Sequence, residues 1–507
     1  MTDDRRAARE VSMSTGTGTG SAEQPQPRPQ QPGPARGTGD GVPGPLPGLA
    51  RAAAALAAGE TTSRALTERA LARIEATQPT LNAFRRVRAE AALAEADAAD
   101  RAREQGRGRP LLGVPVAVKD DTDVCGEPTA FGCAGDFPVK TADAEAVRRL
   151  RAAGAVVVGK TNSPELGQWP FTEGRAFGDT RNPWNPAHTP GGSSGGAAAA
   201  VAAGLVPAAL GSDGAGSIRI PAAWTHLVGI KPQRGRISTW PDPEAFNGIT
   251  VLGPLARTVE DAALLLDAAA GNREGDLHRP PPVDVRGAPG RDPGRLRIAL
   301  STRWAFTATP KRLDPRVDTA VRALAERLAV LGHEVEEADP HYGPIGLTFL
   351  PRATAGIRTW AQRTPDPALL DPRTRAAART GRLLGGPLLR AARAAEEPLR
   401  RHVGRIFRRY DVVLAPTTAT PPPRIGDLAR LSNWQTDRRM IAHCPYAWPW
   451  NVLGWPGVNV PAAVTEPDRL PLGAQLLGPA DSEPLLVSLA AQLEADQRWY
   501  ERRPPAV

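Results

Sequence analysis

Short apolar runs alternate with longer segments of helical periodicity along most of this 507-residue chain, and this alternation restricts the fold more than any other feature. Each run is bounded by Gly, Pro or a charged residue, which is typical of a buried strand. The clearest runs lie at residues 114–118, 155–158, 296–300, 412–414 and 458–460. Such an alternation predicts an α/β fold, in which helices cover both faces of a mixed, largely parallel central sheet.

The clearest helix is predicted between Asp314 and Gly332. Asp314 can cap this helix, Pro315 suits its first turn, and apolar residues recur at positions 317, 321, 324, 328 and 331. Residues 271–295 are rich in Pro, Gly and Arg and have no periodicity. We expect them to form a long surface loop between the two halves of the chain.

The first 45 residues differ from the rest in composition. They are rich in Gly, Pro, Gln and Thr and lack the apolar stretch of a secretion signal, so we expect a disordered tail at 1–45 and one large domain at 46–507. No run reaches the ~18 apolar residues of a membrane span. Cys125, Cys133 and Cys444 form no Cys-x-x-Cys pair, which argues against a disulfide framework or a zinc site and favours a cytoplasmic setting.

Positive charge in this chain is mostly Arg. The formal net charge is +9, yet Lys occurs at only five positions. Arg is densest at residues 352–409, where it is spread among Ala, Leu and Gly without interleaved aromatic residues. This pattern favours a solvated helical face over a nucleic-acid surface.

Lys119 is one of the few lysines, and it directly follows the apolar run at 114–118. A Lys at the end of a strand can simply extend into solvent. If it is held at the end of a buried strand, desolvation lowers its pKa, and the neutral amine can accept a proton near neutral pH. Lys119 is therefore a candidate general base.

A Gly/Ser cluster, PGGSSGG at residues 190–196, precedes an Ala-rich segment that predicts a helix. The cluster could be a linker, but free N–H groups at a helix start favour negative charge. GGSSG also fits the G-x-S-x-G nucleophile elbow, which would make Ser193 or Ser194 the nucleophile. That motif needs a preceding strand, and the prolines at 183, 186 and 190 exclude a central strand here.

A second Gly-rich segment, GSDGAGSIRIP at residues 211–221, follows the apolar run at 206–210. Taken alone it could be an ordinary turn. Small residues before a serine let backbone N–H groups point into a shared cavity, as an oxyanion hole requires. Ser217 is therefore the candidate nucleophile.

Taken in their order along the chain, several segments of this sequence resemble the amidase signature family. The resemblance extends from about residue 46 to the C terminus and is weakest between about residues 272 and 405. The resemblance is carried by GVPVAVKD at 113–120, GKTN at 159–162, GDTRNPW at 178–184, GGSSGG at 191–196 and GSDGAGSIRIP at 211–221, followed by IKPQRGR at 230–236, DVVLAPTT at 411–418 and LGAQLLG at 472–478. It implies a single domain of the amidase signature fold, with its catalytic core at about 110–240.

The resemblance also implies a mechanism. Neutral Lys119 would accept a proton from Ser193, which would accept one from Ser217 as the Ser217 oxygen attacks an amide carbonyl and forms an acyl-enzyme. The implied oxyanion hole consists of the N–H groups of Gly214, Ala215, Gly216 and Ser217, and the implied supporting residues are Ser194, Asp213 and Arg219. We expect a small-molecule amide as the substrate, and we expect no metal, cofactor or nucleic acid to bind. A homodimer is compatible with the sequence.

Two positions depart from the usual family wording GSDTGGSIR, and a third departure lies outside that segment. Gly214 stands in place of Thr, and Ala215 in place of Gly. The methyl group of Ala215 demands a negative φ or a tolerated strain beside the oxyanion hole. His226 stands where the family often has Gly, and we expect a structural His there more than a substrate contact.

Two alternative functions stay open. One is the glutamine-hydrolysing subunit of a tRNA-dependent amidotransferase, which usually reads SIRQPA. Residues 217–222 read SIRIPA, and the apolar Ile220 favours a free-standing amidase. The other is a catalytically silent interaction protein that binds through residues 352–409, but the presence of Lys119, Ser193 and Ser217 argues against it.

The sequence constrains the substrate least, because the segments expected to form the acyl pocket are those where the resemblance is weakest. Trp448, Trp450 and Trp455 could line an apolar pocket for an aryl or alkyl acyl group. Packing in the core would explain them equally well.

Overall fold

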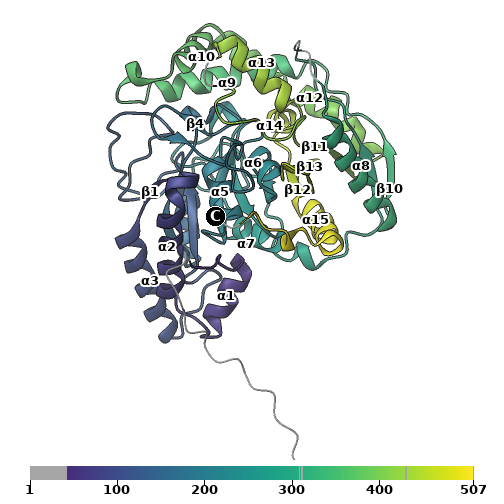
Figure 1. Ribbon diagram of the computed structural model, residues 1–507. Helices are drawn as coiled ribbons and strands as arrows, with labels where there is room; N and C mark the ends of the chain where they lie inside the picture. The colour runs from purple at the N-terminus through teal and green to yellow at the C-terminus, as the bar shows by residue number, and fades with distance from the viewer. Residues whose placement is uncertain (1–42, 308, 310–311, 429–430, 506–507) are drawn as a thin grey trace, which may run out of the picture. The chain divides into compact units, whose positions relative to one another are not determined.

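The computed structural model describes residues 43–307, 309, 312–428 and 431–505 (Figure 1). The predicted tail at 1–45 therefore lies outside the described residues, except for its last three. Those three contact the folded chain, because Arg69 donates to the carbonyls of Gly44 and Pro45, and Arg73 donates to that of Pro43. None of the helices that the structure describes combines the length and apolar character of a membrane-spanning segment.

An eleven-stranded mixed sheet lies at the centre of the described chain, which confirms the predicted fold class. Its strands, in spatial order, are β1 (Phe84–Val87), β3 (Val156–Thr161), β2 (Pro115–Lys119), β6 (Ala208–Asp213), β8 (Val251–Ala256), β7 (Val228–Lys231), β12 (Gly457–Val464), β13 (Pro471–Leu477), β11 (Val412–Pro416), β9 (Arg297–Leu300) and β10 (Glu334–Glu337). Neighbours pair in parallel within β3-β2-β6 and within β11-β9-β10, and the remaining neighbours pair antiparallel. All five apolar runs predicted as strands are strands here.

Helices cover both faces of the sheet, and the alternation of side chains along β2 shows how. Val116 and Val118 join one hydrophobic cluster, while Ala117 between them joins the other. The first cluster includes residues of α1 (Leu49–Ala57), α4 (Glu145–Ala152), α7 (Val259–Ala269), α8 (Pro315–Val330) and α15 (Glu483–Gln497). The second includes residues of α2 (Ser63–Leu81), α3 (Ala89–Glu104), α5 (Gly195–Ala202) and α6 (Arg219–Thr225).

Helix α8 confirms the helix predicted from Asp314 to Gly332. The Asp314 side chain accepts a hydrogen bond from the Arg316 N–H at 2.9 Å, and Gly332 has a φ of 99°, which ends the helical conformation. The predicted loop at 271–295 contains only one turn of 3₁₀ helix among its residues, Ala288–Gly290. A short hairpin of β4 (Glu173–Gly174) and β5 (Gly178–Asp179) lies outside the main sheet.

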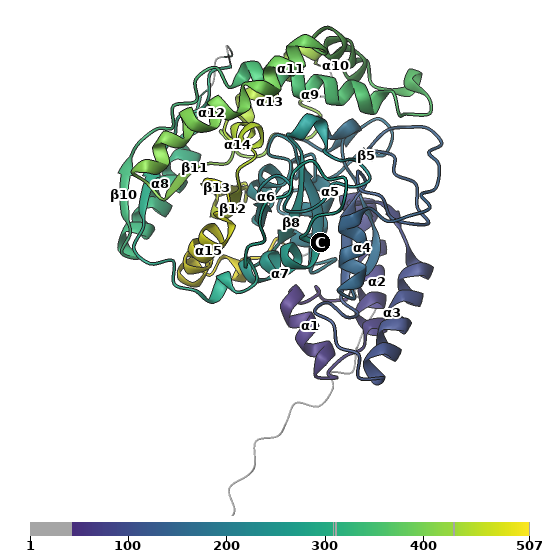
Figure 2. The same cartoon turned by 180° about the vertical axis from the view of Figure 1, so that it is seen from behind.

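A layer of helices that the periodicity did not resolve covers one edge of the sheet. It consists of α9 (Gly346–Ala361), α10 (Pro372–Leu383), α11 (Pro387–Ala394), α12 (Glu396–Val403), α13 (Asn433–His443) and α14 (Trp448–Leu453). Both views show α9, α10 and α13 side by side above the same edge (Figures 1 and 2). The Arg-rich residues 352–409 lie here but are not uniformly solvated, because Arg352 is buried and pairs with Glu396 at 2.7 Å.

Candidate active site

Lys119 is the last residue of β2, and its side chain is fully buried. Its Nζ lies 2.7 Å from Ser193 Oγ, 2.7 Å from Ser212 Oγ and 3.1 Å from Asp121 Oδ2. Burial lowers the pKa of Lys119 below its usual range, and the Asp121 carboxylate raises it only in part. The surroundings therefore favour a neutral amine more than water does.

Ser193 and Ser194 lie in the turn that leads into α5, after a cis peptide bond between Gly192 and Ser193. Ser194 joins this turn to two neighbours. Its Oγ donates to the Ser212 carbonyl at 3.1 Å and accepts the Ser212 N–H at 3.2 Å, while its own N–H donates to the Ser217 carbonyl at 3.1 Å. The turn with Ser193 is thereby fixed against both β6 and the loop that carries Ser217.

Ser217 lies in the loop between β6 and α6, and this loop is wrapped around the buried carboxylate of Asp213. Asp213 accepts the N–H groups of Gly216 at 2.7 Å and Ile218 at 3.2 Å, and it pairs with Arg219 Nε at 3.0 Å. Burial by itself raises the pKa of Asp213, but Arg219 outweighs it, and the pKa lies well below its usual range. Asp213 is therefore an ionised anchor for the loop.

The contact with Asp213 changes the expected set of oxyanion donors. The N–H of Gly216 points to that carboxylate and is not free for a ligand. Within the residues that the structure describes, the N–H groups of Gly214, Ala215 and Ser217 have no hydrogen-bond partner, and all three residues line the same cavity. Sequence reasoning could not separate these donors, because their directions depend on how the loop folds around Asp213.

Ala215 fits its position without the strain that its methyl group could have caused. It is not among the residues with positive φ, whereas its neighbour Gly216 has a φ of 114°. A Cβ at Gly216 would lie 2.7 Å from side-chain carbons of Ala447 and Ile220. Gly216 is thus the position in this loop where both the backbone φ and the lack of space favour glycine.

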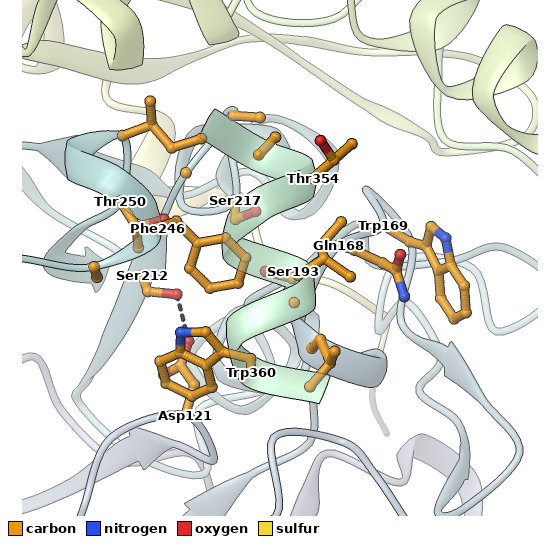
Figure 3. A pocket seen from close by; sticks show the side chains of 18 of the residues that line it. Asp121, Gln168, Trp169, Ser193, Ser212, Ser217, Phe246, Thr250, Thr354 and Trp360 are labelled. Carbon is orange, nitrogen blue, oxygen red and sulfur yellow. Dashed lines mark hydrogen bonds between the residues drawn. The ribbon is translucent and has the colours of Figure 1, made fainter. Parts of the chain in front are cut away.

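Ser193, Ser212 and Ser217 open into a cavity of about 820 Å³ beneath the helical layer (Figure 3). Phe246 and Trp360 line the same cavity, with ring centroids 5.6 Å apart in a stacked arrangement. Further apolar lining comes from Phe131, Phe137, Leu166, Trp169, Ile220, Phe306, Leu347, Phe349, Leu350, Ile357, Met440, Ile441 and Trp448. As expected, much of this wall belongs to the segment of weakest family resemblance.

Of the three tryptophans considered as pocket residues, one lines the cavity and two pack in the core. Trp448 lines the cavity, whereas Trp450 and Trp455 pack in the hydrophobic cluster behind it, with ring centroids 6.4 Å apart. His226 does not line the cavity. It occupies the left-handed position at the C-terminal end of α6 with a φ of 63°, where a glycine is ordinarily favoured, and its ring packs edge-on against Trp184 at 5.1 Å.

Asp121 and Ser212 are site residues that sequence reasoning missed. Ser212 Oγ donates to Asp121 Oδ2, and both residues contact Lys119 Nζ. Their proximity follows from the parallel register of β2 and β6, in which Val118 lies opposite Leu210. That register, had it been known, would have placed the end of β2 next to Gly211 and Ser212.

The family model described as Amidase matches residues 65–487, a span that includes Lys119, Ser193 and Ser217. The chain belongs to the amidase signature family. AmiA2, a protein of Mycobacterium tuberculosis named as an amidase, is 59% identical over 450 residues, which cover 89% of this chain and 93% of that protein. The protein described by our structure is accordingly a hydrolase of amide bonds.

Two solved structures of amide hydrolases resemble this amidase in fold and sequence. The structure of 6-aminohexanoate cyclic dimer hydrolase has a TM-score of 0.83 and 31% sequence identity, and the match covers 91% of this chain and 99% of that chain. A bacterial aryl acylamidase of the amidase signature family has a TM-score of 0.80 and 25% identity, with 90% and 98% covered. Both matches extend over nearly the whole of each chain.

Proposed function

We propose that the protein is a free-standing amidase that cleaves carboxylic amides through an acyl-enzyme on Ser217, with Ser193 and Lys119 as its proton relay. The observation that carries this proposal is the 2.7 Å contact between Lys119 Nζ and Ser193 Oγ, made by a lysine that is fully buried. A buried amine with a lowered pKa can act as a base near neutral pH, which a solvated lysine cannot.

In the acylation step, Ser217 Oγ attacks the carbonyl carbon of the amide. Its proton passes to Ser193 Oγ as the Ser193 proton passes to Lys119 Nζ, so that no free charge develops on either hydroxyl. The tetrahedral oxyanion accepts hydrogen bonds from the unpartnered N–H groups of the loop. Removal of one such donor typically costs about 3 kcal/mol of transition-state stabilisation.

The same relay then works in reverse. Lys119 returns its proton through Ser193 to the amide nitrogen, the C–N bond breaks, and ammonia or an amine leaves. Water next attacks the Ser217 ester, gives its proton to Ser193, and releases the carboxylic acid as Ser217 regains a proton. Side chains of the protein thus carry each proton transfer, and the attacking water supplies the proton that Ser217 regains.

We favour a free-standing amidase over the glutaminase subunit of an amidotransferase because Ile220 lines the cavity together with many aromatic and aliphatic side chains. An apolar wall offers little to the polar side chain of glutamine. It suits an acyl or amine part with substantial apolar surface.

The test is covalent labelling with a fluorophosphonate probe, combined with hydrolysis of short aliphatic and aryl amides. We expect the wild type to label and to hydrolyse, Ser217→Ala to do neither, and Lys119→Ala to label slowly. Ser163→Ala is a matched control, because Ser163 is buried, does not line the cavity, and has no partner for its Oγ within the described chain. Absence of both labelling and hydrolysis in folded wild-type protein would refute the proposal.

A further inference from the structure

Among the described residues, four aspartates line the cavity, and three of them lie within ion-pair distance of a basic side chain. Asp121 lies 3.1 Å from Lys119 Nζ, Asp123 lies 3.2 Å from Lys140 Nζ, and Asp242 lies 2.8 Å from the Arg363 guanidinium. The fourth is Asp437. In the part of the chain that the structure describes, it has no ion pair.

Asp437 lies on α13, in the helical layer above the sheet edge that carries the serines. The only hydrogen bond of its carboxylate among the described residues comes from Asn433, whose Nδ2 donates to Oδ2 at a long 3.3 Å. Burial raises the pKa of Asp437 to about 6, with no neighbouring charge to counter the effect. A cation that entered the cavity would therefore relieve an uncompensated desolvation cost at this carboxylate.

Within the described chain, the cavity offers no comparable partner to an anion. Lys140 and Arg363, the two cationic side chains that line it among the described residues, are already paired with Asp123 and Asp242. The remaining lining is largely apolar, including Trp169 and Met440. Among the described lining residues, the carboxylate of Asp437 is thus the charge without a basic neighbour that a substrate can compensate, in largely apolar surroundings.

We propose that Asp437 is a specificity-determining residue that binds a positively charged nitrogen of the substrate. The preferred substrates are then apolar amides that carry a basic amine in addition to the scissile amide. This inference rests on the proposed function, since it assigns the substrate of the same cavity. Neutral amides of the same shape bind without this ion pair, and carboxylate-bearing amides are repelled.

Two matched pairs of anilides test the inference, because the amine could lie on either side of the scissile bond. One pair is pentananilide with 5-aminopentananilide, and the other is the 4-methylanilide of hexanoic acid with its 4-(aminomethyl)anilide. Dissociation constants are measured by calorimetry on Ser217→Ala protein, with and without Asp437→Asn, at about pH 8, where this carboxyl is ionised and the amine is protonated. Turnover of all four anilides is measured on wild-type protein.

We expect Ser217→Ala protein to bind the charged member of at least one pair about tenfold more tightly, a factor that corresponds to about 1.4 kcal/mol. Asp437→Asn should abolish that preference and change the affinity for neutral anilides by less than about twofold. Asp427→Asn is the control, because Asp427 is exposed in the segment before α13 and does not line the cavity, and it should keep the preference.

Equal binding within both pairs, or a preference that survives Asp437→Asn, would overturn the inference even if wild-type protein hydrolyses the neutral anilides. Conversely, an Asp437-dependent preference without turnover or probe labelling would support the subsite and contradict the proposed mechanism. The binding and turnover measurements thus separate the two failures.

Discussion

Asp121 and burial act in opposite directions on the pKa of Lys119, and Asp121→Asn separates the two effects. The carboxylate lies 3.1 Å from the amine and raises its pKa, against the larger lowering by burial. The substitution removes the negative charge and so lowers the pKa of Lys119 further. Because Lys119, as the proposed base, must be neutral to accept a proton, the acid limb of the kcat/KM profile should move to lower pH.

The measurement is the pH dependence of kcat/KM for one neutral amide in wild type and variant. Asp123→Asn is the matched control, since Asp123 also lines the cavity but pairs with Lys140 at 3.2 Å and not with Lys119. Its acid limb should stay in place. A shift of the Asp121→Asn limb to higher pH would show that another group sets it.

Adjacent residues of the Ser217 loop should respond very differently to small substitutions. Gly216→Ala places a methyl group 2.7 Å from Ala447 and Ile220 at a φ of 114°, so the loop must shift and the oxyanion donors with it. We expect kcat/KM to fall by at least about 100-fold. Ala215→Gly removes an unstrained methyl group and should change kcat/KM by less than about threefold. Steady-state kinetics on folded variants decide this, and comparable losses in both would contradict it.

At the scale of elements, the end of α6 provides a test of pH-dependent stability. Burial lowers the pKa of His226 to about 4, from an unfolded value near 6.5, with a smaller contribution from Arg502. The unfolded chain therefore binds more protons between these values. The free energy of unfolding should fall by roughly 2 kcal/mol on this account as the pH drops from about 7.5 to 5.

His226→Asn should remove that part of the pH dependence, because Asn tolerates a φ of 63° and does not titrate. Urea unfolding at the two pH values measures it in wild type and variant. Because the change in unfolding free energy between the two pH values is compared, any packing lost against Trp184 cancels. An unchanged difference between the two pH values in His226→Asn would refute the assignment.

Strands and helices whose own residues carry a complete pattern could be predicted from the sequence. Contacts that depend on residues far apart in the chain could not. β2 is an apolar run ending at Lys119, and α8 has both a cap and a period, so each could be assigned from its own residues. The contact of Asp121 with Ser212 depends on the register of two strands far apart in the chain. The direction of the Gly216 N–H depends on the side chain of Asp213. These details come from tertiary packing and leave no local pattern.

At the scale of the whole molecule, one carboxylate holds the helical layer to the central sheet. Glu396 on α12 accepts Arg352 of α9 at 2.7 Å, Arg400 of its own helix at 2.8 Å and Arg234, which follows β7, at 2.7 Å. Arg234 and Arg352 are buried. The Arg-rich segment, which the sequence predicts to be a solvated face, therefore also contains buried ion pairs that link the helices to the sheet. These ion pairs fix α9, which forms a wall of the cavity.

Glu396→Gln should weaken this attachment strongly, because it leaves buried arginines facing one another without a counter-charge. We expect a loss of about 3 kcal/mol in the free energy of unfolding and a larger change in KM than in kcat, since α9 contacts the substrate cavity and not Lys119. Glu397→Gln is the matched control: Glu397 is 63% exposed, its ion pairs are 3.7 and 3.9 Å long, and its loss should cost less than about 1 kcal/mol. Urea unfolding and steady-state kinetics on both variants measure the difference. Equal effects of the two substitutions would mean that Glu396 does not hold the layer in place, and that its charge contributes nothing to the cavity wall.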